Sequence, residues 1–184
     1  MIQIIITSLL VFLPALNGEF LFDDPAIPDM VGPRGFWARK AEHSMTFRAE
    51  LRHFLYEPRA LTHYLYRWTW QLAGLRLWAW HGLNFVFHAA NMALVYAALL
   101  PILGGHRALL GAWLFGVHPL QVPSVCYVSG RAGLQATFFT LCGLVLFQQG
   151  HYGLMILSEL CAWKSKQDAP VYAMLFPVYW YFLN

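Results

Sequence analysis

Two adjacent carboxylates, Asp23 and Asp24, are the first residues in this 184-residue sequence whose types and spacing suggest chemistry. They lie in "GEFLFDDPAIPDM", residues 18–30, directly after an uncharged apolar segment. A carboxylate near a membrane surface can accept the proton of a hydroxyl group during group transfer. Alternatively, the two acids form a turn before Pro25 in which both simply face water. The pair therefore predicts either a general base or a solvated helix exit.

The composition of the chain is that of a membrane protein. Hydrophobic residues make up 59% of the sequence, charged residues make up 11%, and the mean hydropathy is +0.48. Soluble proteins are roughly half apolar and about a quarter charged. The net charge of +3 comes from intermixed bases and acids, so it indicates no nucleic-acid partner. The three cysteines, Cys126, Cys142 and Cys161, have no disulfide or metal-site spacing, and we expect no bound metal.

The apolar and polar segments predict a single all-α membrane module over residues 1–184. Crossing about 30 Å of hydrocarbon takes roughly 20 helical residues. We expect residues 1–17 to be the first membrane helix, because they lack the basic start of a cleavable signal peptide. Residues 18–80 form a polar loop with 8 of the 12 Lys and Arg and 7 of the 9 Asp and Glu. Residues 83–184 supply the remaining membrane helices, and about six are expected in all, in the apolar stretches 1–16, 83–103, 108–117, 134–147, 154–163 and 169–183.

Two amphipathic segments of the polar loop are predicted to lie flat in the membrane interface. The first can be capped by Ser44 and is stopped by Pro58, and it has opposed apolar and Arg-rich faces. Such a helix is typical of a membrane surface rather than of a membrane span. The second segment, residues 61–72, carries large aromatic side chains that we expect to contact partner proteins and lipids, namely Tyr64, Tyr66, Trp68 and Trp70.

Histidine and asparagine side chains share one face of the segment that follows. His81 and His88 are seven residues apart, and Asn84 and Asn91 lie on the same face. One interpretation is a haem or chlorophyll ligand, His81 or His88, supported by an amide. We prefer a polar seam that hydrogen-bonds to a neighbouring helix, and so expect no bound cofactor here.

Four stretches of the sequence resemble, in order, the GT-C glycosyltransferases, membrane enzymes that take sugars from lipid-phosphate donors. Within this superfamily the chain looks most like the N-terminal membrane module of the transmembrane and tetratricopeptide-repeat O-mannosyltransferases. The stretches are "NGEFLFDDPAI" (17–27), "LTHYLYRWTWQLAGLRLWAWHGLNFVFHAANMALVYAALL" (61–100), "LFGVHPLQVPSVCYVSGRAGLQATFF" (114–139) and "SKQDAPVYAMLFPVYWYF" (165–182).

The resemblance implies a role for each charged candidate. The donor would be a polyprenyl-phosphate sugar. Asp23 would be the base that takes the acceptor's proton, and Asp24 would orient that base or the acceptor. Arg131 and Lys166 would hold the departing phosphate.

The sequence departs from the family pattern at three acidic positions. Relatives of this kind carry carboxylates where this chain has Pro123, Gly133 and Gln167, although Asp168 could replace the last by a one-residue shift. Catalysis needs these polar sites, whereas helix packing needs only the apolar frame.

Two functions therefore stay open. The sequence favours a non-catalytic accessory subunit of a larger membrane complex, for example a respiratory or photosynthetic one, derived from a GT-C module. The alternative is an active or split glycosyltransferase that uses a polyprenyl-phosphate sugar. The many arginines of residues 34–76 would favour a cytoplasmic loop. The family resemblance instead places loop 18–80 on the periplasmic or luminal side, and we follow it.

Overall fold

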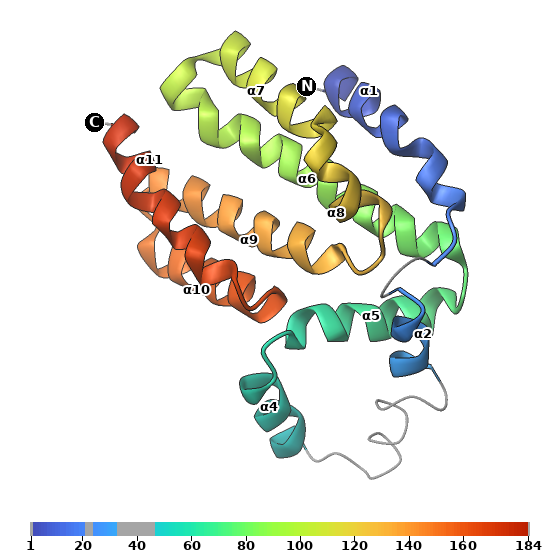
Figure 1. Ribbon diagram of the computed structural model, residues 1–184. Helices are drawn as coiled ribbons and strands as arrows, with labels where there is room; N and C mark the ends of the chain where they lie inside the picture. Colours follow the sequence, from blue (N-terminus) through green and yellow to red (C-terminus); the bar gives the residue numbers. More distant parts are fainter. Residues whose placement is uncertain (1, 21–23, 33–46, 184) are drawn as a thin grey trace.

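A computed structural model of the chain describes residues 2–20, 24–32 and 47–183 (Figure 1). These residues form helices and connecting turns, with no strand among them, which confirms the all-α prediction. The α-helices are α1 (Ile2–Phe12), α2 (Ala26–Val31), α4 (Phe47–Tyr56), α5 (Ala60–Ala73), α6 (Leu77–Leu103), α7 (Gly105–Val117), α8 (Val122–Cys126), α9 (Arg131–Gln148), α10 (Tyr152–Ser165) and α11 (Leu175–Leu183). Three 3₁₀-helices join them, η1 (Leu13–Asn17), η2 (Pro119–Gln121) and η3 (Ala169–Met174).

Helix α6 is the element best suited to cross a membrane. Its 27 residues give a length of about 40 Å, and among the described helices it alone is both long and apolar enough to cross unaided. The segments Gly105–Val117 and Pro119–Cys126 pass the same test only together, with a bend of 52° between them. The predicted six spans are therefore not established by the lengths of the helices. Helix α6 also begins at Leu77, six residues before the expected start at 83.

The helices pack around α6. Helices α7 and α9 both pack against it, α10 packs against α9, and α1 lies along α7. Figure 1 shows both termini near the end of the bundle that holds the α6–α7 turn, with α2, α4 and α5 at the other end. Gly116 lies where α1, α6 and α7 meet, and a Cβ there would lie 2.5 Å from Met92 Cε and 2.8 Å from Ser8 Oγ, so those side chains would have to shift.

The polar face of α6 turns toward neighbouring helices. Asn84 Nδ2 donates to the Tyr127 carbonyl at 2.7 Å, and Asn91 Nδ2 donates to the Leu134 carbonyl at 3.1 Å. His88 Nε2 lies 3.0 Å from the Gly116 carbonyl. These contacts confirm the predicted seam for Asn84, His88 and Asn91, whereas the buried His81 forms no side-chain hydrogen bond among the described residues. The described residues contain no group of three or more His, Cys, Asp and Glu side chains that could hold a metal ion.

The second amphipathic segment was predicted within one residue at each end, since α5 spans Ala60–Ala73. In Figure 1 this helix runs across one end of the bundle. Helix α4 ends at Tyr56, before Pro58 as expected, whereas its proposed cap Ser44 lies outside the described residues. Of the four aromatic residues assigned to partner contacts, Trp68 is 59% exposed and Tyr66 is buried. Tyr64 and Trp70 are half-buried.

Candidate functional site

Asp24 lies inside the protein, directly before helix α2. Its side chain is fully buried, and both carboxylate oxygens accept backbone hydrogen bonds. Val128 N donates to Oδ2 at 2.9 Å, and Ser129 N donates to Oδ1 at 2.7 Å. The prediction that both acids could simply face water is therefore wrong for Asp24. Asp23, the candidate base, lies outside the described residues.

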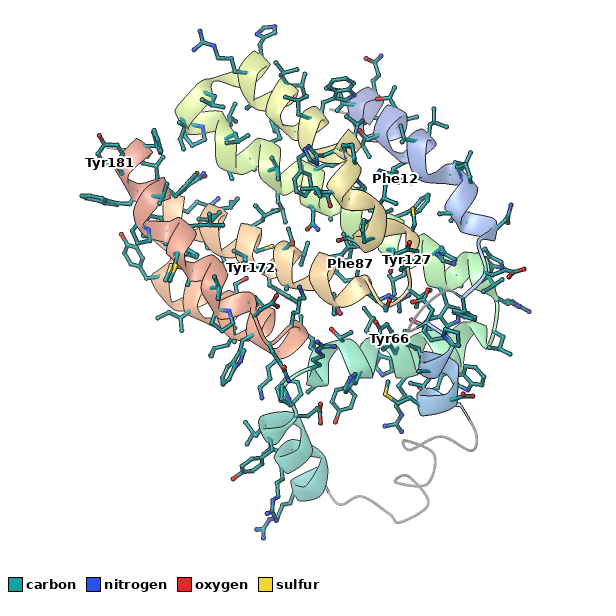
Figure 2. The ribbon with its side chains drawn as sticks, in the orientation of Figure 1. Phe12, Tyr66, Phe87, Tyr127, Tyr172 and Tyr181 are labelled. Atoms are coloured by element: carbon teal, nitrogen blue, oxygen red, sulfur yellow. The ribbon has the colours of Figure 1, made fainter. Side chains whose placement is uncertain are left out.

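The two amides belong to residues 125–131, which we call the 125–131 turn. It runs from the last two residues of α8 to the first residue of α9. Asn84 of α6 donates to the Val125 and Tyr127 carbonyls at 3.3 and 2.7 Å. The Tyr66 hydroxyl of α5 donates to the Val128 carbonyl at 3.2 Å, and Figure 2 labels Tyr66 and Tyr127 in this region. Three separate parts of the chain thus satisfy the backbone of one turn. Buried backbone groups need such partners.

Gly130 is required by the shape of this turn. A Cβ at Gly130 would lie 2.4 Å from the Pro123 carbonyl oxygen and 2.5 Å from that of Ser124. Both contacts are with backbone atoms, so a larger residue would force the chain itself to move. Gly130, which precedes Arg131, therefore has a packing role.

Arg131 is the last residue of the 125–131 turn and the first residue of α9, and its side chain is fully buried. Nε donates to Asn84 Oδ1 at 3.1 Å, Nη1 donates to Thr69 Oγ1 at 3.1 Å, and Nη2 donates to the Trp80 carbonyl at 2.7 Å. The guanidinium carbon lies 5.1 Å from the Tyr66 ring centroid and 5.2 Å from that of Trp80. Three of the five N–H donors of an arginine are used in this way. In this structure Arg131 joins α9 to α5 and α6, and its assignment as a phosphate ligand stays a prediction.

The hydroxyl of Tyr66 is held in its protonated form. Burial raises the pKa of Tyr66 to about 12, Asp24 adds to the rise, and the positive charges of Arg131 and Arg59 oppose it. Tyr66 consequently stays a hydrogen-bond donor to the 125–131 turn at any physiological pH.

A cleft of about 180 Å³ lies between α2, α5 and the start of α9. Ser129, whose amide binds Asp24, lines one part of it. Arg59, an exposed residue at the start of α5, also lines the cleft and gives it a positive charge. The other lining residues are Ala26, Ile27, Met30, Thr62, His63, Tyr66 and Ala132. The cleft thus combines a basic side chain and hydroxyl groups with apolar residues, next to the buried acid.

Lys166 lies just beyond the end of α10, at the same end of the bundle. Its Nζ donates to Asp168 Oδ2 at 2.9 Å, with both side chains partly exposed. Burial alone would lower the pKa of Lys166, but the hydrogen bond and charge of Asp168, together with the interaction with Tyr172, more than compensate, so the pKa is raised. The preceding residue, Ser165, places its carbonyl oxygen 2.9 Å from the Thr62 hydroxyl of α5. Lys166 and the 125–131 turn are thus both anchored to α5.

Two of the positions without the expected carboxylate lie beside this turn. Pro123 is in the first turn of α8, and Gly133 is in the first turn of α9. A Cβ at position 133 would have Ser124 Oγ as its nearest neighbour, at 4.0 Å, which leaves room for a side chain. Gln167 is in the turn between Lys166 and Asp168.

Three contributors to this region were missed in the sequence analysis. Thr69 and the Trp80 carbonyl bind Arg131, and no local pattern indicates that an arginine 51 residues later would reach Trp80. Arg59 was also missed, because a single basic residue in an Arg-rich loop carries no specific signal.

Comparison with known proteins places this site in context. No protein-family model and no solved structure matches the chain. The chain is 26% identical to protein O-mannosyl-transferase TMTC2 of Homo sapiens in an alignment that covers 86% of the chain and 21% of the relative. It is 32% identical to TMTC3 of Mus musculus over 98 residues, which cover 53% of the chain and 10% of the relative. Protein O-mannosyl-transferase F38B6.6 of Caenorhabditis elegans is 26% identical, with coverage of 89% and 26%.

These similarities identify a GT-C-like membrane glycosyltransferase relationship, as the motifs predicted. The chain is a homologue of the protein O-mannosyl-transferases over part of their length. It spans about a fifth of the human TMTC2 sequence that it matches.

Proposed function

We propose that this chain is a glycosyltransferase module that transfers mannose from a polyprenyl-phosphate donor to a hydroxyl group of a protein acceptor. The observation that carries the proposal is that Asp24 binds the 125–131 turn beside one cleft. Asp24 binds the amide of Ser129, and Ser129 lines the cleft beside Arg59. A cation and a concave surface are parts that such a transfer needs, and Asp24 joins the sequence position of the candidate base to them.

The transfer would proceed with Asp23 as the base. The acceptor oxygen attacks the anomeric carbon of the sugar, and its proton passes to the Asp23 carboxylate. The bond between the sugar and the phosphate oxygen breaks, and the polyprenyl phosphate leaves with the bonding electrons. Arg59 is the cation that the cleft itself presents to that phosphate. Lys166 is a second candidate, and its partner Asp168 would have to release it.

The same proposal includes a multi-pass arrangement. Six segments would cross the membrane, namely α1 with η1, α6, α7 with α8, α9, α10, and η3 with α11. Those shorter than α6 would rely on flanking residues, tilt or local thinning of the bilayer. Helices α2, α4 and α5 would lie at the periplasmic or luminal interface, where a lipid-linked sugar and a protein acceptor can meet.

The proposal is tested by reconstituting the chain in proteoliposomes with radiolabelled polyprenyl-phosphate mannose and a Ser/Thr-rich peptide. We expect Asp23→Asn to lower the transfer rate about 100-fold or more, because the general base is removed with little change in volume. Asp29→Asn, which changes an exposed acid of α2, is the matched control and should leave the rate unchanged. Full activity of inserted Asp23→Asn would overturn the assignment of the base.

The second candidate function is a non-catalytic subunit of a larger membrane complex. It is favoured by Pro123, Gly133 and Gln167, none of which supplies a carboxylate, and by the use of Arg131 inside the fold. Under this proposal Trp68 is the exposed aromatic anchor of α5. Extraction in mild detergent followed by mass spectrometry should find partner subunits. Trp68→Ala should weaken their binding to this chain. A chain that migrates alone and transfers mannose would exclude this candidate.

A further inference from the structure

Asp24, the second residue of the acid pair, is enclosed by the protein. Asp24 has no exposed surface, and each of its oxygens already accepts a backbone hydrogen bond. A substrate could reach this carboxylate only by displacing one of those amides. Asp24 is therefore poorly suited to contact an acceptor hydroxyl.

The residues that Asp24 binds are far along the chain. Val128 and Ser129 follow it by 104 and 105 residues. The same turn receives hydrogen bonds from Tyr66 and Asn84, but both of those side chains bind carbonyl groups. Among the described side chains bound to this turn, Asp24 alone accepts hydrogen bonds from its amides.

The 125–131 turn shapes both the cleft and the start of α9. Ser129 and Ala132 line the cleft, and Arg131 lies between these two residues in the sequence. A shift of the Ser129 amide would move the cleft wall together with the first residues of α9. Small displacements of positioning groups are costly for group transfer.

We infer that Asp24 is a positioning residue that fixes the 125–131 turn against α2 and α5, and that it does not touch the substrate. This divides the "DD" motif into one structural acid and one acid left for chemistry. The catalytic consequence rests on the proposed function, whereas the fixing of the turn does not.

Hydrogen–deuterium exchange of residues 125–131 in nanodiscs tests the inference without any assay of activity. Asp24→Ala removes both acceptors, and we expect exchange of the Val128 and Ser129 amides to rise roughly 10-fold or more. Asp24→Asn keeps one acceptor oxygen and should give a smaller rise. Asp29→Asn is again the matched control, and its exchange should equal that of the wild type. Unchanged exchange in Asp24→Ala would overturn the inference.

Two further measurements keep the inference open to refutation if Asp24→Ala does not fold. Tyr66→Phe removes a donor to the Val128 carbonyl and should increase exchange in the same turn, with little effect in the middle of α6. In the transfer assay, Asp24→Asn should lower kcat while the pH dependence keeps its acidic limb. Loss of that limb in Asp24→Asn, with normal exchange of the turn, would make Asp24 the base instead. An inactive wild-type chain would contradict the proposed function and leave the exchange test intact.

Discussion

Arg131 and Trp80 meet twice, through the backbone and through the ring. Nη2 of Arg131 donates to the Trp80 carbonyl at 2.7 Å, and the guanidinium carbon lies 5.2 Å from the indole ring centroid. Planar guanidinium groups favour such combined hydrogen bonding and stacking, which an ammonium group cannot reproduce. Because Trp80 is on α6 and Arg131 is on α9, this pair fixes the two helices where the candidate site lies.

Arg131→Lys should destabilise the protein although it keeps the positive charge. Lysine cannot donate simultaneously to Asn84, Thr69 and the Trp80 carbonyl with the same planar geometry, so at least one buried acceptor loses its partner. We expect a loss of about 2 kcal/mol in the free energy of unfolding. Thermal unfolding in detergent measures it, with Arg48→Lys on the exposed face of α4 as the control. Wild-type stability combined with weaker donor binding would instead favour Arg131 as a phosphate ligand.

Local periodicity is why several elements could be predicted from the sequence. The spacing of aromatic and basic residues placed α5 within one residue at each end, and the seven-residue spacing of Asn84 and Asn91 predicted their shared face. These patterns depend only on the geometry of a single helix. The start of α6 was misplaced because Trp78 and Trp80 are amphipathic and were assigned to the loop.

The contacts of Asp24 and Arg131 could not be predicted in this way. An acid before Pro25 suits a solvated turn as well as a buried one, and its partners lie more than 100 residues away. Arginine is usually a surface residue. Arg131 is buried because residues of α5 and α6 bind its side chain, and these partners could not be predicted. The resemblance to a family named Arg131 but left the partners of its side chain unspecified.

Arg59→Gln should weaken donor binding without affecting the fold. The side chain is exposed, and it lines the cleft beside Ser129. If Arg59 binds the donor phosphate as proposed, the substitution removes a charged hydrogen bond, and we expect KM for the polyprenyl-phosphate donor to rise about 10-fold at similar kcat. Arg48→Gln, an exposed arginine outside the cleft lining, is the control for general loss of positive charge. Equal effects of the two substitutions would argue against a specific phosphate contact.

Gly130 and Gly133 should respond oppositely to alanine. Alanine at 130 would bring its Cβ to 2.4 Å from a backbone oxygen, and we expect a loss of about 1–3 kcal/mol. Alanine at 133 meets no atom closer than 4.0 Å and should stabilise α9 by about 0.5–1 kcal/mol. Unfolding of the two variants in the same detergent gives the comparison. Equal stabilities would show that the turn does not pack as described.

Gly133→Asp distinguishes the two candidate functions. At position 133 the family that this chain resembles carries an acid, and the space around this position accommodates a side chain. An acid in the first turn of a helix is also favoured by the helix dipole, by about 0.3–1 kcal/mol, so the variant should fold. If the module transfers mannose, we expect the added carboxylate beside the 125–131 turn to change kcat severalfold relative to Gly133→Asn, which has nearly the same volume and no charge. If the chain is a non-catalytic subunit, neither variant will transfer mannose above background, and both will assemble with the partners of the wild type. Equal, measurable transfer by the two variants would show that a charge at this position has no part in the reaction.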